Sequence, residues 1–156
     1  MATDDLRSAG VTRMDDEEIR AFVSNQGIGV LALPDDGAPY AIPMSFDFDG
    51  EDRLYFTYLL GGDSRKEALS DRAEAASVLV YDATSPFIWQ SALLTGEITR
   101  LPADRKDDVL DALDTAWRPA VFRDADLSRG TAIYEFRIVE STGFKQAGLP
   151  PGFDRE

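Results

Sequence analysis

Apolar and polar residues alternate along several stretches of this chain, as expected for β-strands with one buried face. The clearest example is "TAIYEFRIVES" at residues 131–141, and "GIGVLALP" near the N-terminal end indicates a strand that is buried more completely. Turn residues separate most of these stretches. The pattern predicts six strands, at residues 27–34, 38–49, 53–60, 77–82, 87–101 and 131–141.

Three helices are predicted between these strands. The first is capped by Asp15 or Asp16, the second runs from about Ser64 to Arg72, and the third begins near Pro102, which suits a first helical turn. Apolar side chains at helical spacing form one face of the first helix and one face of the third. These are Ile19, Phe22 and Val23, and then Val109, Leu110, Leu113, Ala116 and Trp117.

Short turns join most successive strands, so the sheet should be antiparallel. We therefore expect a single α+β, mainly β domain over residues 14–145, built on a small closed or half-closed barrel. Residues 1–13 have no periodicity and are predicted to be a flexible arm, and residues 146–156 an irregular tail. Pro39 and Pro43 interrupt the second strand and place it at an edge, a bulge or a gap in pairing.

The charge of the chain narrows the choice of partners. Its 29 acidic and 16 basic residues give a net charge of -13 that is spread along the sequence, which argues against binding to nucleic acid or anionic membranes. Asp outnumbers Glu by 20 to 9 and Arg outnumbers Lys by 13 to 3, a balance typical of salt-loving microbes and suggesting a haloarchaeal origin. No apolar run is long enough to cross a membrane, so we expect a cytoplasmic protein.

Cysteine and histidine are both absent. Their absence excludes thiolate nucleophiles and zinc–thiolate sites, and removes the side chain best suited to proton transfer near neutral pH. The acidic stretch "DFDGED" does not have the spacing of an EF-hand, so no metal site is predicted. Chemistry in this protein would therefore depend on a bound cofactor.

The segment "GGDSRKEAL" at residues 61–69 gathers positive charge in an acidic chain. Ser64 and Glu67 have the spacing of a capping box, so Arg65 and Lys66 lie at the start of a helix, where free N–H groups attract anions. This combination can form a phosphate site, although it lacks the P-loop spacing. The alternative is that Ser64 only caps the helix and both cations face solvent.

Two strand segments are further binding candidates. Pro43 leaves a stretch poor in N–H donors, with Met44 and Ser45 on opposite faces, against which a flat heteroaromatic ligand could lie. Gln90 and Ser91 could donate hydrogen bonds to a ligand or simply line the solvent. Met44 could equally be an ordinary core residue.

The order of the motifs "GVLAL", "PYAIPMSFDFD", "LYFTY", "SRKEAL", "SVLVYD" and "WQSALLTGEI" is more specific than any one of them. Between about Asp15 and Ser141 the chain resembles the pyridoxamine 5′-phosphate oxidase-related, FMN-binding split-barrel family. The resemblance implies a six-stranded antiparallel split barrel with Greek-key connections. It also implies a homodimer that holds two FMN molecules at its interface and acts on a small-molecule substrate or electron donor.

The resemblance assigns ten residues to the cofactor and names no catalytic residue. The phosphate would be held by Ser64, Arg65 and Lys66. The main chain of Pro43, Met44 and Ser45 would run beside the isoalloxazine ring. Phe56 and Thr57 would lie near the ribityl chain and the ring, and Gln90 and Ser91 would reach the flavin of the same or the other subunit.

The C-terminal tail "STGFKQAGLPPGFDRE" departs from the family, because it has no histidine and no basic cluster for a substrate phosphate. This argues against pyridoxamine phosphate oxidation itself. The missing histidine also separates the chain from nitroimidazole-reducing relatives and disfavours haem. We expect an FMN-dependent oxidoreductase, with an F420-dependent reductase or a non-catalytic flavin-binding module as alternatives.

Overall fold

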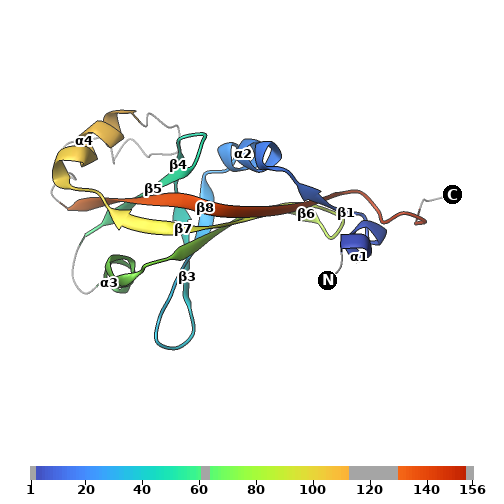
Figure 1. Cartoon of the computed structure of the whole chain (residues 1–156), viewed down its shortest axis with the longest axis horizontal. Helices are drawn as coiled ribbons and strands as arrows, with labels where there is room; N and C mark the ends of the chain where they lie inside the picture. The colour runs from blue at the N-terminus through green and yellow to red at the C-terminus, as the bar shows by residue number, and fades with distance from the viewer. Residues whose placement is uncertain (1–2, 61–63, 113–129, 154–156) are drawn as a thin grey trace.

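A computed structural model describes residues 3–60, 64–112 and 130–153. In this part of the chain, helices surround one curved sheet (Figure 1). The sheet has the strand order β3-β2-β6-β7-β8-β5-β4, with β1 added on β8, and every pairing is antiparallel. The strands are β1 (Val11–Met14), β2 (Ile28–Leu33), β3 (Tyr40–Ser45), β4 (Asp47–Phe48), β5 (Arg53–Leu59), β6 (Ala76–Ser85), β7 (Ile88–Arg100) and β8 (Thr131–Ala147). The helices are α1 (Thr3–Ser8), α2 (Asp16–Ser24), α3 (Arg65–Arg72) and α4 (Ala103–Ala112).

The mainly β, antiparallel fold predicted from the sequence is confirmed. Each of the six predicted segments contains a strand, and the second segment contains both β3 and β4. The predicted edge position of the proline-containing strand is also confirmed, because Pro43 lies in β3, at one end of the strand order.

One continuous stretch of chain joins the two ends of the sheet. Residues 40–45 pair with β2 as strand β3, and residues 47–48 pair with β5 as strand β4. Phe46 lies at the crossover, where its N–H donates to the Gly27 carbonyl oxygen at 3.0 Å. Because the first and last strands of the order belong to the same segment, the sheet closes on itself as a split barrel.

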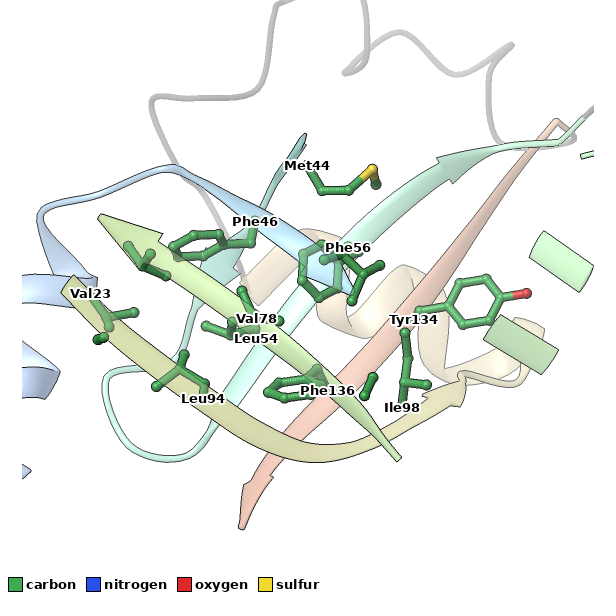
Figure 2. Close-up of a cluster of buried hydrophobic side chains, with 14 of the residues drawn as sticks. Val23, Met44, Phe46, Leu54, Phe56, Val78, Leu94, Ile98, Tyr134 and Phe136 are labelled. Atoms are coloured by element: carbon green, nitrogen blue, oxygen red, sulfur yellow. The ribbon is translucent and has the colours of Figure 1, made fainter. Parts of the chain in front are cut away.

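The barrel is filled by side chains from the inner faces of these strands, as Figure 2 shows. Phe46 and Phe56 meet edge to face with ring centroids 6.5 Å apart, a favoured aromatic geometry. Burial alternates along β5, where Leu54, Phe56 and Tyr58 are buried and the residues between them are partly exposed. This alternation is the period of two seen in the sequence.

Helix α2 covers one part of the barrel next to β8 (Figure 1). Asp15 caps it by accepting a hydrogen bond from the Glu18 N–H at 2.8 Å, and Ile19, Phe22 and Val23 are buried, as predicted. A Cβ atom added to Gly143 of β8 would lie 2.8 Å from the Ile19 side chain. The helix therefore packs directly on the backbone of β8.

The prediction of a loose arm over residues 1–13 is wrong. Residues 3–8 form α1, and β1 pairs with residues 143–146 of β8. Gln146 adds to this contact by donating to the Ala9 carbonyl oxygen at 2.9 Å. Only the two ends of β1 are buried, so this short strand has no alternating pattern in the sequence. It is held in place by its pairing with β8.

The end of the last predicted strand differs as well. Strand β8 continues to Ala147, whereas the sequence pattern predicted an end at residue 141. The predicted third helix is present as α4. Its predicted apolar residues Leu113, Ala116 and Trp117 lie outside the described residues.

We predict that Gly96→Ala lowers the free energy of unfolding by about 2–3 kcal/mol, because the site is overpacked. Gly96 lies where the register between β7 and β8 shifts, and an added Cβ would overlap the Arg137 carbonyl oxygen. Urea unfolding followed by circular dichroism measures the loss. Gly37→Ala is the control, since its Cβ would meet nothing within 4 Å. Equal stability of the two variants would contradict the packing described for β7 and β8.

Candidate functional site

Helix α3 begins at the residue that the sequence predicted as its cap. The Ser64 hydroxyl accepts a hydrogen bond from the Glu67 N–H at 3.2 Å. The Glu67 carboxylate accepts from Arg100 of β7 at 3.1 Å, which ties the first turn of the helix to the sheet. Gly61 and Gly62, which precede this turn, lie outside the described residues.

Lys66 brings together two segments that were both predicted to contact a ligand. Its ammonium group donates to the Met44 sulfur at 3.6 Å and lies 4.7 Å from the centre of the Tyr58 ring. Burial lowers the pKa of Lys66 below its ordinary value of 10.5. Met44 is itself buried and lies within the core cluster drawn in Figure 2. Lys66 thus points toward β3 and does not extend freely into solvent.

Arg65 is exposed, but its guanidinium also has partners. It donates to the carboxylate of Asp35 in the β2–β3 turn and lies 5.1 Å from the centre of the Tyr40 ring. Arg72, seven residues further along α3, approaches the same carboxylate at 3.7 Å. The hydrogen bond from Arg65 holds the pKa of Asp35 below its ordinary value. From the sequence, residues 35–37 were expected only to connect the predicted strands at 27–34 and 38–49, with no signal for this contact.

Two tyrosines join α3 to the barrel, and the sequence analysis did not single out either one. Tyr58 of β5 and Tyr134 of β8 stack with ring centroids 4.1 Å apart. The Tyr58 hydroxyl shares a 2.7 Å hydrogen bond with Ser70, and the Tyr134 hydroxyl donates to Asp71 at 2.6 Å. Burial raises the pKa of Tyr58 to about 12 and also raises the pKa of Tyr134, so both hydroxyls remain protonated near neutral pH.

The predicted ring-side residues alternate between the two sides of the barrel wall. Met44 is buried, while Pro43 and Ser45 are exposed on the outer side of β3. The Phe56 side chain is fully buried, so only its main chain is available to a ligand outside the barrel. Thr57 is partly exposed on the opposite side of β5.

Within one chain, Gln90 and Ser91 form a group separate from the α3 residues. They sit near the start of β7, whereas the contact with α3 is made at Arg100, nine residues after Ser91. Across the sheet, Leu93 pairs with Leu79, Leu79 with Val30, and Val30 with Pro43, so β7 lies three strand spacings, about 14 Å, from β3. The predicted residues therefore form two groups, one at α3 and β3 and one at the start of β7.

A shallow hollow of about 430 Å³ lies on the outer surface over β2, between β3 and β6. One wall contains Pro43, and another contains Tyr81 and Asp82 of β6, which pair in register with Ser91 and Gln90. The rest of the lining is formed by residues 25–30 and Ala83. The hollow thus connects the exposed side of β3 with the start of β7.

Exposed apolar side chains cover the outer surface of β2, β6 and β7 beside the hollow. We call these four residues, Ile28, Leu79, Tyr81 and Leu93, the outer apolar face. Leu79 of β6 pairs in register with Leu93 of β7 and with Val30 of β2, so the exposed side chains of the three strands lie next to one another. Between 37% and 58% of each residue of the face is exposed. A contiguous exposed apolar surface of this kind is typical of an interaction site.

The described residues contain neither a helix suited to cross a membrane nor a metal-binding group of acidic side chains. None of the helices there is both long and apolar enough to cross a membrane. Within the same part of the chain, no group of three or more Asp or Glu residues could hold a metal ion.

Comparison with known proteins gives one family and several similar structures. The model of the family described as "Pyridoxamine 5'-phosphate oxidase" matches residues 15–145. No curated protein matches the chain.

Three similar solved structures share the fold at low sequence identity. An FAD-binding protein from Mesorhizobium loti is 21% identical with a TM-score of 0.67, over 88% of this chain and 99% of its own. The FAD- and haem-binding protein of Mycobacterium smegmatis is 23% identical with a TM-score of 0.72, over 94% and 77%. The flavocytochrome Anf3 of Azotobacter vinelandii is 19% identical with a TM-score of 0.65, over 94% and 73%.

We predict that Tyr58→Phe lowers the free energy of unfolding by about 1–2 kcal/mol, because it leaves the buried Ser70 hydroxyl without its partner. Removing both hydroxyls with Tyr58→Phe plus Ser70→Ala should restore most of the loss. Urea unfolding of the two single variants and the double variant measures this coupling. Strictly additive losses would show that the hydrogen bond does not hold α3 to β5.

Proposed function

The chain belongs to the pyridoxamine 5′-phosphate oxidase family, and on this basis we propose that it binds FMN and acts as a flavin-dependent oxidoreductase on a small substrate. The observation that carries the proposal is the contact between Lys66, beside the capped start of α3, and Met44 of β3. It joins the proposed phosphate-binding residues to the segment proposed to run beside the flavin ring. The flavin-binding descriptions of the similar structures agree with this proposal.

The residues at α3 fit a single phosphate. The helix start provides free N–H groups, Arg65 a planar guanidinium and Lys66 a point charge. Acidic residues outnumber basic ones by 29 to 16 over the chain, so it offers few unpaired cations for a more highly charged cofactor. F420, which carries an acidic tail beyond its phosphate, is therefore the second candidate. Titrating the protein with FMN, FAD and F420 ranks the three affinities directly.

The side chains described here would bind and orient the flavin. A bound flavin supplies hydride and electron transfer, which no side chain of this protein can provide. Pro43 and Ser45 are exposed on β3, where their main-chain groups could face the ring, and the hollow beside them gives access from solvent. Without histidine, the chain has no imidazole to ligate haem or to move a proton near neutral pH.

Absorbance and mass of the ligand that copurifies in high salt test whether a flavin is bound at all. A flavin-loaded protein that NADH and NADPH do not reduce, and that oxidises no donor tested, would instead be a non-catalytic flavin-binding module.

We further propose that the working unit is a homodimer with the flavin at its interface. Within one chain, Ser91 and the α3 residues form two separate groups, and a second copy would bring its own Ser91 to the same flavin. The outer apolar face lies beside the hollow and supplies the kind of surface that a dimer buries. A symmetric pairing of this face would place the start of β7 of one copy near β3 of the other.

We predict that Arg65→Ala plus Lys66→Ala weakens FMN binding about a hundredfold, because two charge-assisted contacts are lost. Quenching of flavin fluorescence measures the dissociation constant. Arg20→Ala plus Arg105→Ala, on α2 and α4, removes the same charge from two exposed positions and is the matched control. Unchanged FMN affinity in the α3 double variant would refute the phosphate assignment.

We also predict that Leu93→Asp converts the dimer to a monomer and weakens flavin binding, since it puts a charge in the outer apolar face. Sedimentation velocity gives the oligomeric state. Val139→Asp is the control, because Val139 is also exposed, at 62%, but lies on β8 outside this face. A monomeric wild-type protein, or a Leu93→Asp variant that stays dimeric, would contradict the proposed interface.

A further inference from the structure

Helix α3 already holds an anion, and that anion is part of the chain itself. One oxygen of the Asp35 carboxylate accepts from Arg65, and the other accepts from the Asp36 N–H at 2.8 Å and faces Arg72 at 3.7 Å. The two arginines lie seven residues apart, about two turns, on the same side of α3. Only 16% of the Asp35 side chain is exposed, against 64% for Arg65. The carboxylate is thus seated between two guanidinium groups.

From this arrangement we propose that Asp35 is the resident counter-ion of the phosphate site, and that a cofactor phosphate binds by displacing it from Arg65. The inference rests on the proposed function, because it takes Arg65 as a phosphate ligand. Asp35, which the family resemblance did not assign to the cofactor, would then set the affinity of the site for phosphate.

Electrostatics favours competition over cooperation between the two anions. A phosphate that binds the Arg65 guanidinium would lie within a few ångströms of a carboxylate that is ionised near neutral pH. Two negative charges that share one guanidinium repel each other, so each anion reduces the affinity of that guanidinium for the other anion. Asp35 therefore weakens the binding of every ligand that carries its negative charge to Arg65.

The position of Asp35 in the fold allows this displacement. The β2–β3 ladder ends at the pair Leu33 and Tyr40, so Asp35 lies in the turn beyond the last paired residues. The turn can move away from α3 without breaking a ladder hydrogen bond. Phosphate binding would then release the turn from the helix, and the flavin ring would play no part in that step.

Removing the Asp35 charge should change the affinity only for a flavin that carries a phosphate. Asp35→Asn should tighten FMN binding about tenfold and leave riboflavin, which has no phosphate, unchanged. Asp35→Ala should act in the same direction and provides a second variant in case the first folds poorly. Asp36→Asn removes an equal charge from the neighbouring exposed residue and should change either affinity less than about twofold. Fluorescence quenching gives the affinities, and circular dichroism confirms that each variant is folded.

The possible results separate this inference from the proposed function. If the wild-type protein prefers FMN to riboflavin but neither Asp35 variant binds FMN more tightly, Asp35 is not a competitor and the flavin proposal stands. If the wild type and both Asp35 variants bind FMN and riboflavin equally, the phosphate assignment and this inference are both wrong. If no variant binds a flavin, the proposed function fails.

Discussion

The crossover at Phe46 is the constraint on which the rest of the molecule depends. Because residues 40–48 begin on one end of the sheet and finish on the other, the sheet must curve until its two ends meet. The same crossover fixes which side chains of this segment face inward. Met44 and Phe46 enter the barrel, while Pro43 and Ser45 stay on its outer wall. The geometry of the candidate site is therefore a consequence of how the barrel closes.

Helix α3 is joined to this barrel by the polar ends of core aromatic residues. Tyr58 and Tyr134 bury their rings against each other and extend their hydroxyls to Ser70 and Asp71. A buried tyrosine needs a partner for its hydroxyl, so packing of the core and placement of the helix are satisfied together. The start of α3 is positioned by the interior of the protein as much as by its own cap.

Local signals in the sequence were enough to predict the strands and the caps. Asp15 and Ser64 act within three residues of their partners, and alternation along β5 and β8 reports burial directly. The pairing of β1 with β8 could not be predicted in this way, since residues more than 100 positions apart order each other. The Asp35–Arg65 pair and the Met44–Lys66 contact could not be predicted either, because each joins two separate elements, 30 and 22 residues apart in the chain. The residues of the site were chosen by resemblance, and their arrangement in two groups became visible only in three dimensions.

Strand β8 has a consequence for how the protein is made. It pairs with β1, β5 and β7, and each of these strands leaves the ribosome before β8 does. During synthesis the edges of these strands that pair with β8 therefore stay unpaired until β8 is made. Unpaired strand edges can associate with other chains. The spread of negative charge that argues against nucleic-acid binding has a second effect here. Nascent chains that repel one another have time to close the barrel before their edges meet.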